Sequence, residues 1–234
     1  MNEGKFNDSL RWCHTLLKTL KIVKQEYIPR TVDYSEDSKA LAQSETSTYQ
    51  AIYKTAVNNL DYEFSMVDDS LLQLYLNGNI IRYAFIQNPI QPLSFSDFLR
   101  EIFDDKDIPT DEDKLIELQS ELQEDYEQRL NDQRLNDKAI YLRYDFDQTG
   151  YKPRVHSFAH LHVGLNQNFR IPIHIIMTPL SFVVTIIKWL YPNYWINILE
   201  DSELTKQFDN YKGKDENIQK EMWQNSEYKD YFLG

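Results

Sequence analysis

The chain has 234 residues, of which 41% are hydrophobic and 14% aromatic, and its formal net charge is −12. A chain of this length and composition can bury a full core, which excludes a disordered protein, and a single cysteine excludes a disulfide framework. Six glycines are present and none belongs to a Gly-rich phosphate loop, which excludes nucleotide folds of the P-loop and dinucleotide-binding types.

The acidity is confined to one segment. Residues 101–137 carry −10 of the net charge of −12, so the acidic total does not describe the rest of the chain, although a general binder of double-stranded DNA is not expected. The N-terminus lacks an apolar signal segment, and prolines and charged residues interrupt the most apolar stretch, 171–195. We therefore expect a cytoplasmic protein without a membrane span.

Two helices and a β-meander are expected in the first hundred residues. Apolar residues recur every three or four positions in 6–25 and in 48–60, which predicts amphipathic helices. From Asp61 the hydrophobic period changes to two, and short turns rich in Asn, Asp and Gly separate the apolar runs. The three strands expected from this pattern are 61–66, 72–76 and 81–85.

The next part of the chain is polar. Ser94 is an N-cap candidate for a short helix that ends near Phe103, and 114–136 predicts a long polar helix with one narrow apolar stripe. The stripe consists of Leu115, Leu118, Leu122, Tyr126 and Leu130. We expect one α+β domain over 1–234 with a long acidic helical insert at about 101–137, leaning on the core by this stripe.

Three further predicted strands place polar residues on one surface. Successive side chains of a strand point to opposite faces. In 139–147 the even-numbered residues are apolar and the odd-numbered residues are polar. In 155–165 and in 169–175 the even-numbered residues are polar instead. The residues on the shared polar face are Tyr141, Arg143, Asp145, Asp147, His156, His160, His162, Arg170 and His174.

Turn lengths predict the register of these strands. An eight-residue loop sets Arg143 opposite His160 and Tyr141 opposite His162, and a three-residue turn at 166–168 sets His174 opposite His160. Side chains that stand opposite each other lie about 5 Å apart at Cβ. The expected cluster is therefore His160, His162, His174, Arg143, Arg170, Tyr141 and Asp145. Thr178 and Pro179 then open an apolar helix that ends at Tyr191, is closed by Pro192 and packs on the other face.

Histidine exchanges protons near neutral pH, and arginine binds phosphate. Together they favour metal-independent phosphodiester cleavage, with His160 and His162 as acid and base and Arg143 and Arg170 as anion stabilisers. Tyr141 and Asp145 are expected to orient these groups. In RNA the 2′-hydroxyl supplies the nucleophile, so no cofactor is needed.

A divalent metal is the alternative cofactor. His160 and His162 with Asp145 or Asp147 could form a two-histidine, one-carboxylate site, but the neighbouring arginines would repel a cation. Two known families with an HxH motif do not fit. Gly164 stands where histidine-triad hydrolases need a third histidine, and no glutamate follows as in a cupin.

Four segments carry a family resemblance. YLRYD at 141–145, HSFAHLHVG at 156–164, RIPI at 170–173 and TPLSF at 178–182 resemble, in this order, a bacterial family known as domain of unknown function 2290. That resemblance implies no established activity. The pattern YxRYD followed by HxH is also similar to small toxins of the TumE type, which implies toxin–antitoxin or antiviral defence biology.

The sequence thus predicts an α+β fold with an antiparallel sheet of about six strands and helices packed mainly on one face. The first functional hypothesis is an RNA-directed nuclease or phosphodiesterase, toxin-like or associated with phage defence, that binds RNA or single-stranded nucleic acid. The second is a non-catalytic subunit of a bacterial anti-phage defence complex that binds a protein partner through the acidic helix 113–137.

Overall fold

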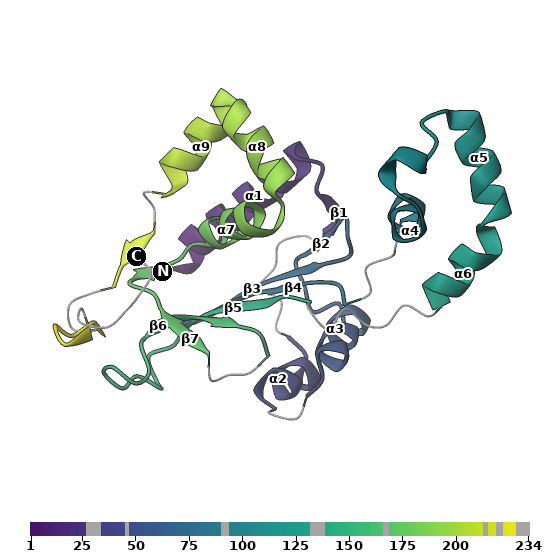
Figure 1. Ribbon diagram of the computed structural model, residues 1–234. Helices are drawn as coiled ribbons and strands as arrows, with labels where there is room; N and C mark the ends of the chain where they lie inside the picture. The colour runs from purple at the N-terminus through teal and green to yellow at the C-terminus, as the bar shows by residue number, and fades with distance from the viewer. Residues whose placement is uncertain are drawn as a thin grey trace. The chain divides into compact units, whose positions relative to one another are not determined.

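The structure is a computed structural model that describes residues 1–26, 34–44, 47–89, 94–131, 139–165, 169–212, 215–218 and 222–227. Within these ranges the centre of the fold is an antiparallel sheet of seven strands, in which each strand pairs with its neighbours in the chain (Figure 1). The strands are β1 (Val23–Glu26), β2 (Phe64–Met66), β3 (Leu71–Asn77), β4 (Ile80–Ile86), β5 (Tyr141–Phe146), β6 (Ala159–Val163) and β7 (Arg170–Pro172). The expected α+β class is confirmed.

Two tight turns shape the meander. Gly78 and Asn79 join β3 to β4, and Gly78 has φ 56°, a conformation that glycine adopts without steric cost. Between β2 and β3 the carboxylate of Asp68 accepts the backbone N–H of Ser70 at 3.0 Å, which closes a local turn. The three strands expected over 61–85 are thus confirmed as β2, β3 and β4.

One face of the sheet is covered by α1 (Glu3–Thr19) and α7 (Pro179–Leu190), which lie above the sheet in Figure 1. Thr178 caps α7 by accepting the N–H of Ser181, and Pro179 occupies its first turn, as the sequence predicts. Alternate strand residues and the apolar stripes of the two helices form the main core. Its helical members include Phe6, Leu10, Leu17, Val183 and Ile186.

The opposite face is partly covered by α2 (Glu36–Gln43) and α3 (Tyr49–Asn58), which lie below the sheet in Figure 1. Ala56 of α3 belongs to a second, smaller apolar cluster on this face. The carboxylate of Asp61 accepts hydrogen bonds from the hydroxyls of Ser35 and Ser38, and these bonds hold α2 on the sheet. The sequence pattern predicted α3 but not α2, which is too short to show a clear period. It extended the first helix to residue 25, which is wrong, because α1 ends at Thr19 and Val23–Glu26 form β1.

The chain after α7 is helical before it forms a small second sheet. Pro192 was expected to close α7, and it also opens α8 (Pro192–Glu200), because proline fits the first turn of a helix. The helix α9 (Ser202–Lys212) follows, and β9 (Glu216–Asn217) pairs with β8 (Ile175–Ile176). Among the described residues, every helix is too short or too polar to cross a membrane.

Residues 89–138 form a second compact unit. Its helices are α4 (Phe95–Ile102), the short 3-10 helix η1 (Asp105–Asp107), α5 (Glu112–Glu121) and α6 (Gln123–Asn131). The rings of Phe95 and Phe98 lie 5.3 and 5.4 Å from the ring of Tyr126, and these contacts join α4 to α6.

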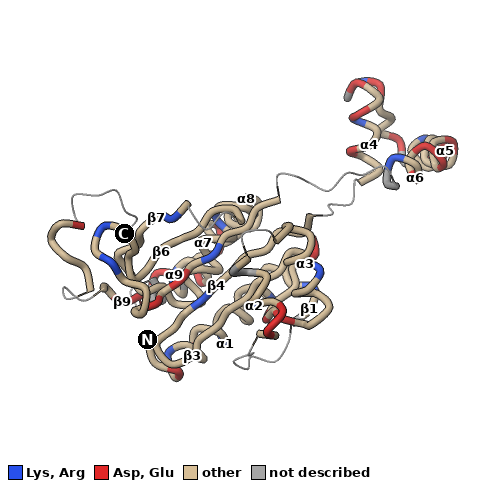
Figure 2. Tube along the Cα trace, turned by 90° about the horizontal axis from the view of Figure 1, so that it is seen from below, with Lys and Arg blue, Asp and Glu red and all other residues tan. Residues whose placement is uncertain are grey.

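The long helix expected over 114–136 is divided at Leu122, and its residues 132–136 lie outside the described part of the chain. The apolar stripe is present, since Leu115, Leu118 and Tyr126 are half-buried. Acidic residues are spread along α5 and α6 (Figure 2). These helices are therefore surface helices of the second unit.

Candidate functional site

Two rows of polar side chains cross the face of the sheet opposite α1 and α7. In the first row Arg170, His162 and Arg143 stand opposite one another on β7, β6 and β5. In the second row His160, Asp145 and Arg82 stand opposite one another on β6, β5 and β4. The predicted parity of β5 and β6 is confirmed, because their polar residues share one face.

The expected register between β5 and β6 was wrong by two residues. His162 rather than His160 lies opposite Arg143, and Tyr141 accepts a backbone hydrogen bond from Gly164 instead of lying opposite His162. The connection is longer than the expected eight residues because it contains a turn of its own, closed by an isolated bridge between residues 152 and 156. A shift of two returns every side chain to the same face, so the cluster forms nevertheless.

The register between β6 and β7 was also wrong by two residues. Pro172 rather than His174 stands opposite His160, and β7 ends at this proline, which has no N–H to donate. The chain then turns toward β8, and the ring of His174 lies 4.8 Å from the ring of Trp223. The expectation that His174 lies beside His160 is therefore wrong, and His174 does not line the cavity described below.

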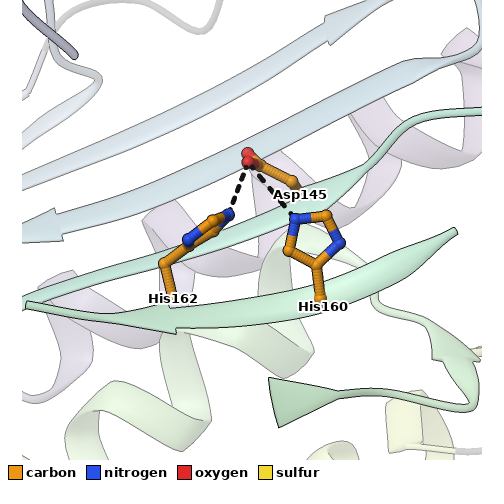
Figure 3. Close-up of side chains that lie close together, drawn as sticks. All are labelled: Asp145, His160 and His162. Carbon is orange, nitrogen blue, oxygen red and sulfur yellow. Dashed lines mark ion pairs between the residues drawn. The ribbon is translucent and has the colours of Figure 1, made fainter. Parts of the chain in front are cut away.

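Asp145 is the centre of the cluster (Figure 3). Its Oδ2 lies 2.9 Å from Arg143 Nη2, 3.2 Å from His162 Nε2 and 3.9 Å from His160 Nε2. Burial raises the pKa of Asp145, but the hydrogen bond from His162 and the charge of Arg143 outweigh it and lower the pKa to about 2. Oδ1 is buried and has no hydrogen-bond partner among the described residues. The carboxylate is therefore ionised at neutral pH.

The backbone fixes the ring of His160. Its Nδ1 lies 3.1 Å from the carbonyl oxygen of Ser157. A carbonyl only accepts, so Nδ1 carries the proton and Nε2 of the neutral ring carries the lone pair. Burial lowers the pKa of His160 to about 4, against the opposing effect of Asp145. At pH 7 the ring thus presents an unprotonated nitrogen beside the carboxylate.

His162 contacts both members of the ion pair. Its Nε2 lies 3.2 Å from Asp145 Oδ2 and 3.1 Å from Arg143 Nη2. A neutral ring nitrogen cannot both donate and accept, and the negative charge of the carboxylate favours donation to Asp145. Nδ1 then carries the lone pair, and this atom is buried without a partner among the described residues. Burial lowers the pKa of His162 as well.

These side chains line a cavity of about 400 Å³, a size typical of small-molecule sites. The sheet and its loops contribute Arg82, Tyr141, Arg143, Asp145, Asp147, His156, His160, His162 and Arg170 to the wall. The helical side contributes Tyr34, Ser38, Lys39, Ile52 and Ala56. The structure therefore brings together every expected site residue except His174.

The same cluster has the spacing of a metal site. Donor atoms of Asp145, His160 and His162 lie within 4.8 Å of one another, and the Nδ1–H bond of His160 to a carbonyl is typical of metal-binding histidines. The guanidinium of Arg143 contacts the same carboxylate oxygen and would repel a cation. Asp147, the other expected carboxylate, accepts two hydrogen bonds from Thr149 at 2.8 and 2.7 Å. The donor set fits a metal, while its charge environment opposes one.

Three basic residues of the wall, Arg82, His156 and Lys39, were not among the expected site residues. Arg82 alternates with the apolar Ile81 and Tyr83, and this pattern could have identified it. His156 has the parity of His160 but belongs to the loop before β6. Lys39 lies on α2, which the sequence pattern did not predict.

The fold and the cavity define a class of protein: an antiparallel α+β meander that holds histidines, arginines and a carboxylate in a cavity on one face of its sheet. The chain belongs to the family described as "Uncharacterized conserved protein (DUF2290)", whose model matches residues 17–228. The family resemblance seen in the sequence is thus confirmed. No curated protein and no solved structure matches the chain, and the similarity to TumE-type toxins is not shown.

Proposed function

We propose that this protein is an RNA-directed phosphodiesterase that cleaves without a metal ion. The observation that supports the proposal most is the position of an unprotonated His160 Nε2 beside the Arg143–Asp145 ion pair in one cavity. The histidine can accept a proton, and the arginine can stabilise negative charge on a phosphoryl group. The 2′-hydroxyl of RNA supplies the nucleophile, so the protein needs none of its own.

Arg143 and Arg170, which stand on either side of His162 in the first row, bind the non-bridging oxygens of the phosphodiester. A guanidinium presents five N–H donors in a planar fork, a geometry that suits phosphate oxygens. Tyr141 and Asp145 both contact Arg143 and orient it. Arg82 adds a third positive charge to the wall.

His160 acts as the general base. Its Nε2 takes the proton of the 2′-hydroxyl while the 2′-oxygen attacks phosphorus and the bond to the 5′-oxygen breaks. The products are a 2′,3′-cyclic phosphate and a 5′-hydroxyl. A bound phosphodiester raises the pKa of His160 from its low value in the empty cavity, because a neighbouring negative charge favours the protonated ring.

Cleavage of single-stranded RNA in the presence of EDTA tests the proposal. The parent protein should be active with a bell-shaped pH profile that brackets neutrality, and His160→Ala and His162→Ala should each lower the rate about 100-fold. His14→Ala is the matched control, since His14 lies on α1 and does not line the cavity. Melting temperatures of all variants separate lost chemistry from lost folding. RNA left intact by the parent under every condition would reject the function.

The metal alternative is decided by the same assay. If the parent is inactive in EDTA and recovers on adding zinc or manganese, the cluster is a metal centre with Asp145 or Asp147 as its carboxylate ligand. In that case Arg143→Met should strengthen metal binding, because it removes the positive charge that opposes the cation.

A second candidate function is a protein-binding subunit of a bacterial anti-phage defence complex. The observation that favours it is the separate compact unit of residues 89–138 with its exposed acidic helices. The acidic residues proposed for docking are Glu117, Glu121, Glu124 and Asp125, all exposed. Reversing these four charges should abolish partner capture and leave RNA cleavage unchanged if the two units act independently. Both candidates operate in the bacterial cytoplasm, which cell fractionation would test.

A further inference from the structure

The loop between β5 and β6 brings a third histidine to the cavity. Residues 152 and 156 exchange two backbone hydrogen bonds of 2.9 and 2.8 Å, and Arg154 has φ 63° in the turn between them. The ring of Tyr151 stacks on Phe158 at 4.0 Å and fixes the base of this loop. The loop therefore holds His156 in one position beside the sheet.

The ring of His156 lies 4.8 Å from the ring of His160, and His160 lies 4.7 Å from His162, so the three rings form a row. His156 lines the cavity and is only partly buried, whereas His160 and His162 are 3% and 2% exposed. Nδ1 of His156 is buried and has no hydrogen-bond partner among the described residues. His156 is thus the histidine of the row that solvent reaches most easily.

RNA cleavage needs a proton donor for the leaving 5′-oxygen as well as a base. In His160, Nδ1–H is donated to a backbone carbonyl and Nε2 is the proposed base. In His162, Nε2–H is donated to Asp145 and Nδ1 is buried. Neither ring has a proton to give to a leaving group, so among the three histidines of the row this leaves His156.

We propose that His156 is the general acid of the reaction, an assignment that rests on the proposed RNA phosphodiesterase function. As the bond between phosphorus and the 5′-oxygen breaks, the proton of His156 passes to that oxygen, and the proton of the 2′-hydroxyl is on His160. The two histidines then exchange protons with water and return to their starting states. No other reactant is required.

The charges around His156 support this role. Burial and the positive charge of Arg170 lower the pKa of His156 in the empty cavity, and Asp147 acts against them. A phosphodiester bound at Arg170 neutralises that positive charge and adds negative charge of its own, and both changes raise the pKa. Substrate binding therefore favours the protonated form of His156.

Gly150 leaves room for this ring. A Cβ at position 150 would lie 3.0 Å from His156 Cε1, closer than side-chain atoms normally approach. Gly150→Ala should therefore displace the imidazole of His156 without removing it. This variant is a second test of the position of His156.

Two substrates that share the 2′-hydroxyl but differ in leaving group test the assignment. One is a uridine-containing dinucleotide, whose 5′-oxygen must be protonated, and the other is uridine 3′-(4-nitrophenyl phosphate), whose nitrophenolate leaves without a proton. His156→Gln should lower cleavage of the dinucleotide about 100-fold and change cleavage of the nitrophenyl ester less than about threefold. Gly150→Ala should show the same selectivity with a smaller loss.

His160→Gln should lose activity on both substrates, and His14→Gln on neither. The assignment is overturned if His156→Gln cleaves the dinucleotide like the parent, or if it loses both substrates equally while its melting temperature is unchanged. Failure of the parent on both substrates would reject the proposed function itself, so the two failures are distinguishable.

Discussion

The two faces of the central sheet are chemically opposite, although both contain fully buried side chains. In β5 the side chains of Leu142 and Tyr144 belong to the main core with α1 and α7, whereas Arg143 and Asp145, which alternate with them, line the cavity. Tyr144 is 0% exposed and His162 on the neighbouring strand is 2% exposed. Burial therefore does not distinguish Tyr144 from His162; the chemistry of their buried atoms does.

This difference separates stability from function. Apolar burial on the core face stabilises the fold, while buried charges stabilise it only when they are fully paired. On the cavity face Asp145 Oδ1 and His162 Nδ1 lack hydrogen-bond partners among the described residues, although Arg82 Nε lies 3.8 Å from Oδ1, and a missing hydrogen bond is a cost in folding free energy. We infer that these groups are kept buried for their chemistry.

The largest expected effect comes from placing a charge on the core face. Ile186 of α7 is 1% exposed in the main core, so Ile186→Asp buries an unpaired carboxylate and should lower the free energy of unfolding by more than about 4 kcal/mol. Urea denaturation measures this. Ile186→Val is the control and should lower it by about 1 kcal/mol. A stable Asp variant would show that this face of α7 is not core.

On the cavity face, acid should destabilise the protein through His160. Because its folded pKa is about 4 and its ordinary value is 6.5, the unfolded chain binds a proton on this ring between these pH values and the folded protein does not. The free energy of unfolding should fall by about 3 kcal/mol as the pH falls from 6.5 to 4. In His160→Gln this contribution should be absent, which urea denaturation at several pH values would show. An identical pH dependence in both proteins would mean that His160 is exposed to water.

Asp145 should act in the same direction as His160, but over a lower pH range. Its pKa is lowered from 3.8 to about 2, so its stabilisation is present above pH 4 and is lost as the pH falls through 2. Asp145→Asn should lower the free energy of unfolding by about 2 kcal/mol at neutral pH, and the difference from the parent should shrink toward pH 2. Asp147→Asn, two residues along the chain, is the matched control with a smaller expected loss. A difference that does not vary with pH would show that the Arg143–Asp145 pair does not form.

Strand parity predicted which residues share a face, and register could not be predicted in the same way. The alternation of Leu142, Arg143, Tyr144 and Asp145 placed the site on one side of the sheet because a strand has a strict period of two. Register depends on the loops, and the loop before β6 folds into its own turn. Nothing in the hydrophobic pattern distinguishes a shift of zero from a shift of two.

The contacts that define the site join side chains and backbone groups in ways that the residue pattern does not predict. The ion pair of Arg143 with Asp145 joins residues two apart on one strand, and its chemistry depends on His160 and His162 of the next strand. The proton position on His160 depends on the carbonyl of Ser157, which no pattern of residue types shows. Residue types thus predicted the members of the cluster, and only the structure gives their partners.

The smallest expected effect is at His174. The sequence pattern predicted this histidine in the cluster, but in the structure it lies outside the cluster. Its ring contacts Trp223 and does not line the cavity. His174→Gln should therefore change RNA cleavage less than about twofold. The lost aromatic contact should lower the free energy of unfolding by about 1 kcal/mol. The measurement compares its rate with that of His160→Gln under the same conditions. Equal losses of activity in these two variants, with both proteins folded, would place His174 in the site and contradict the β6–β7 register. A loss confined to His160→Gln would confirm that the cavity face ends at Pro172.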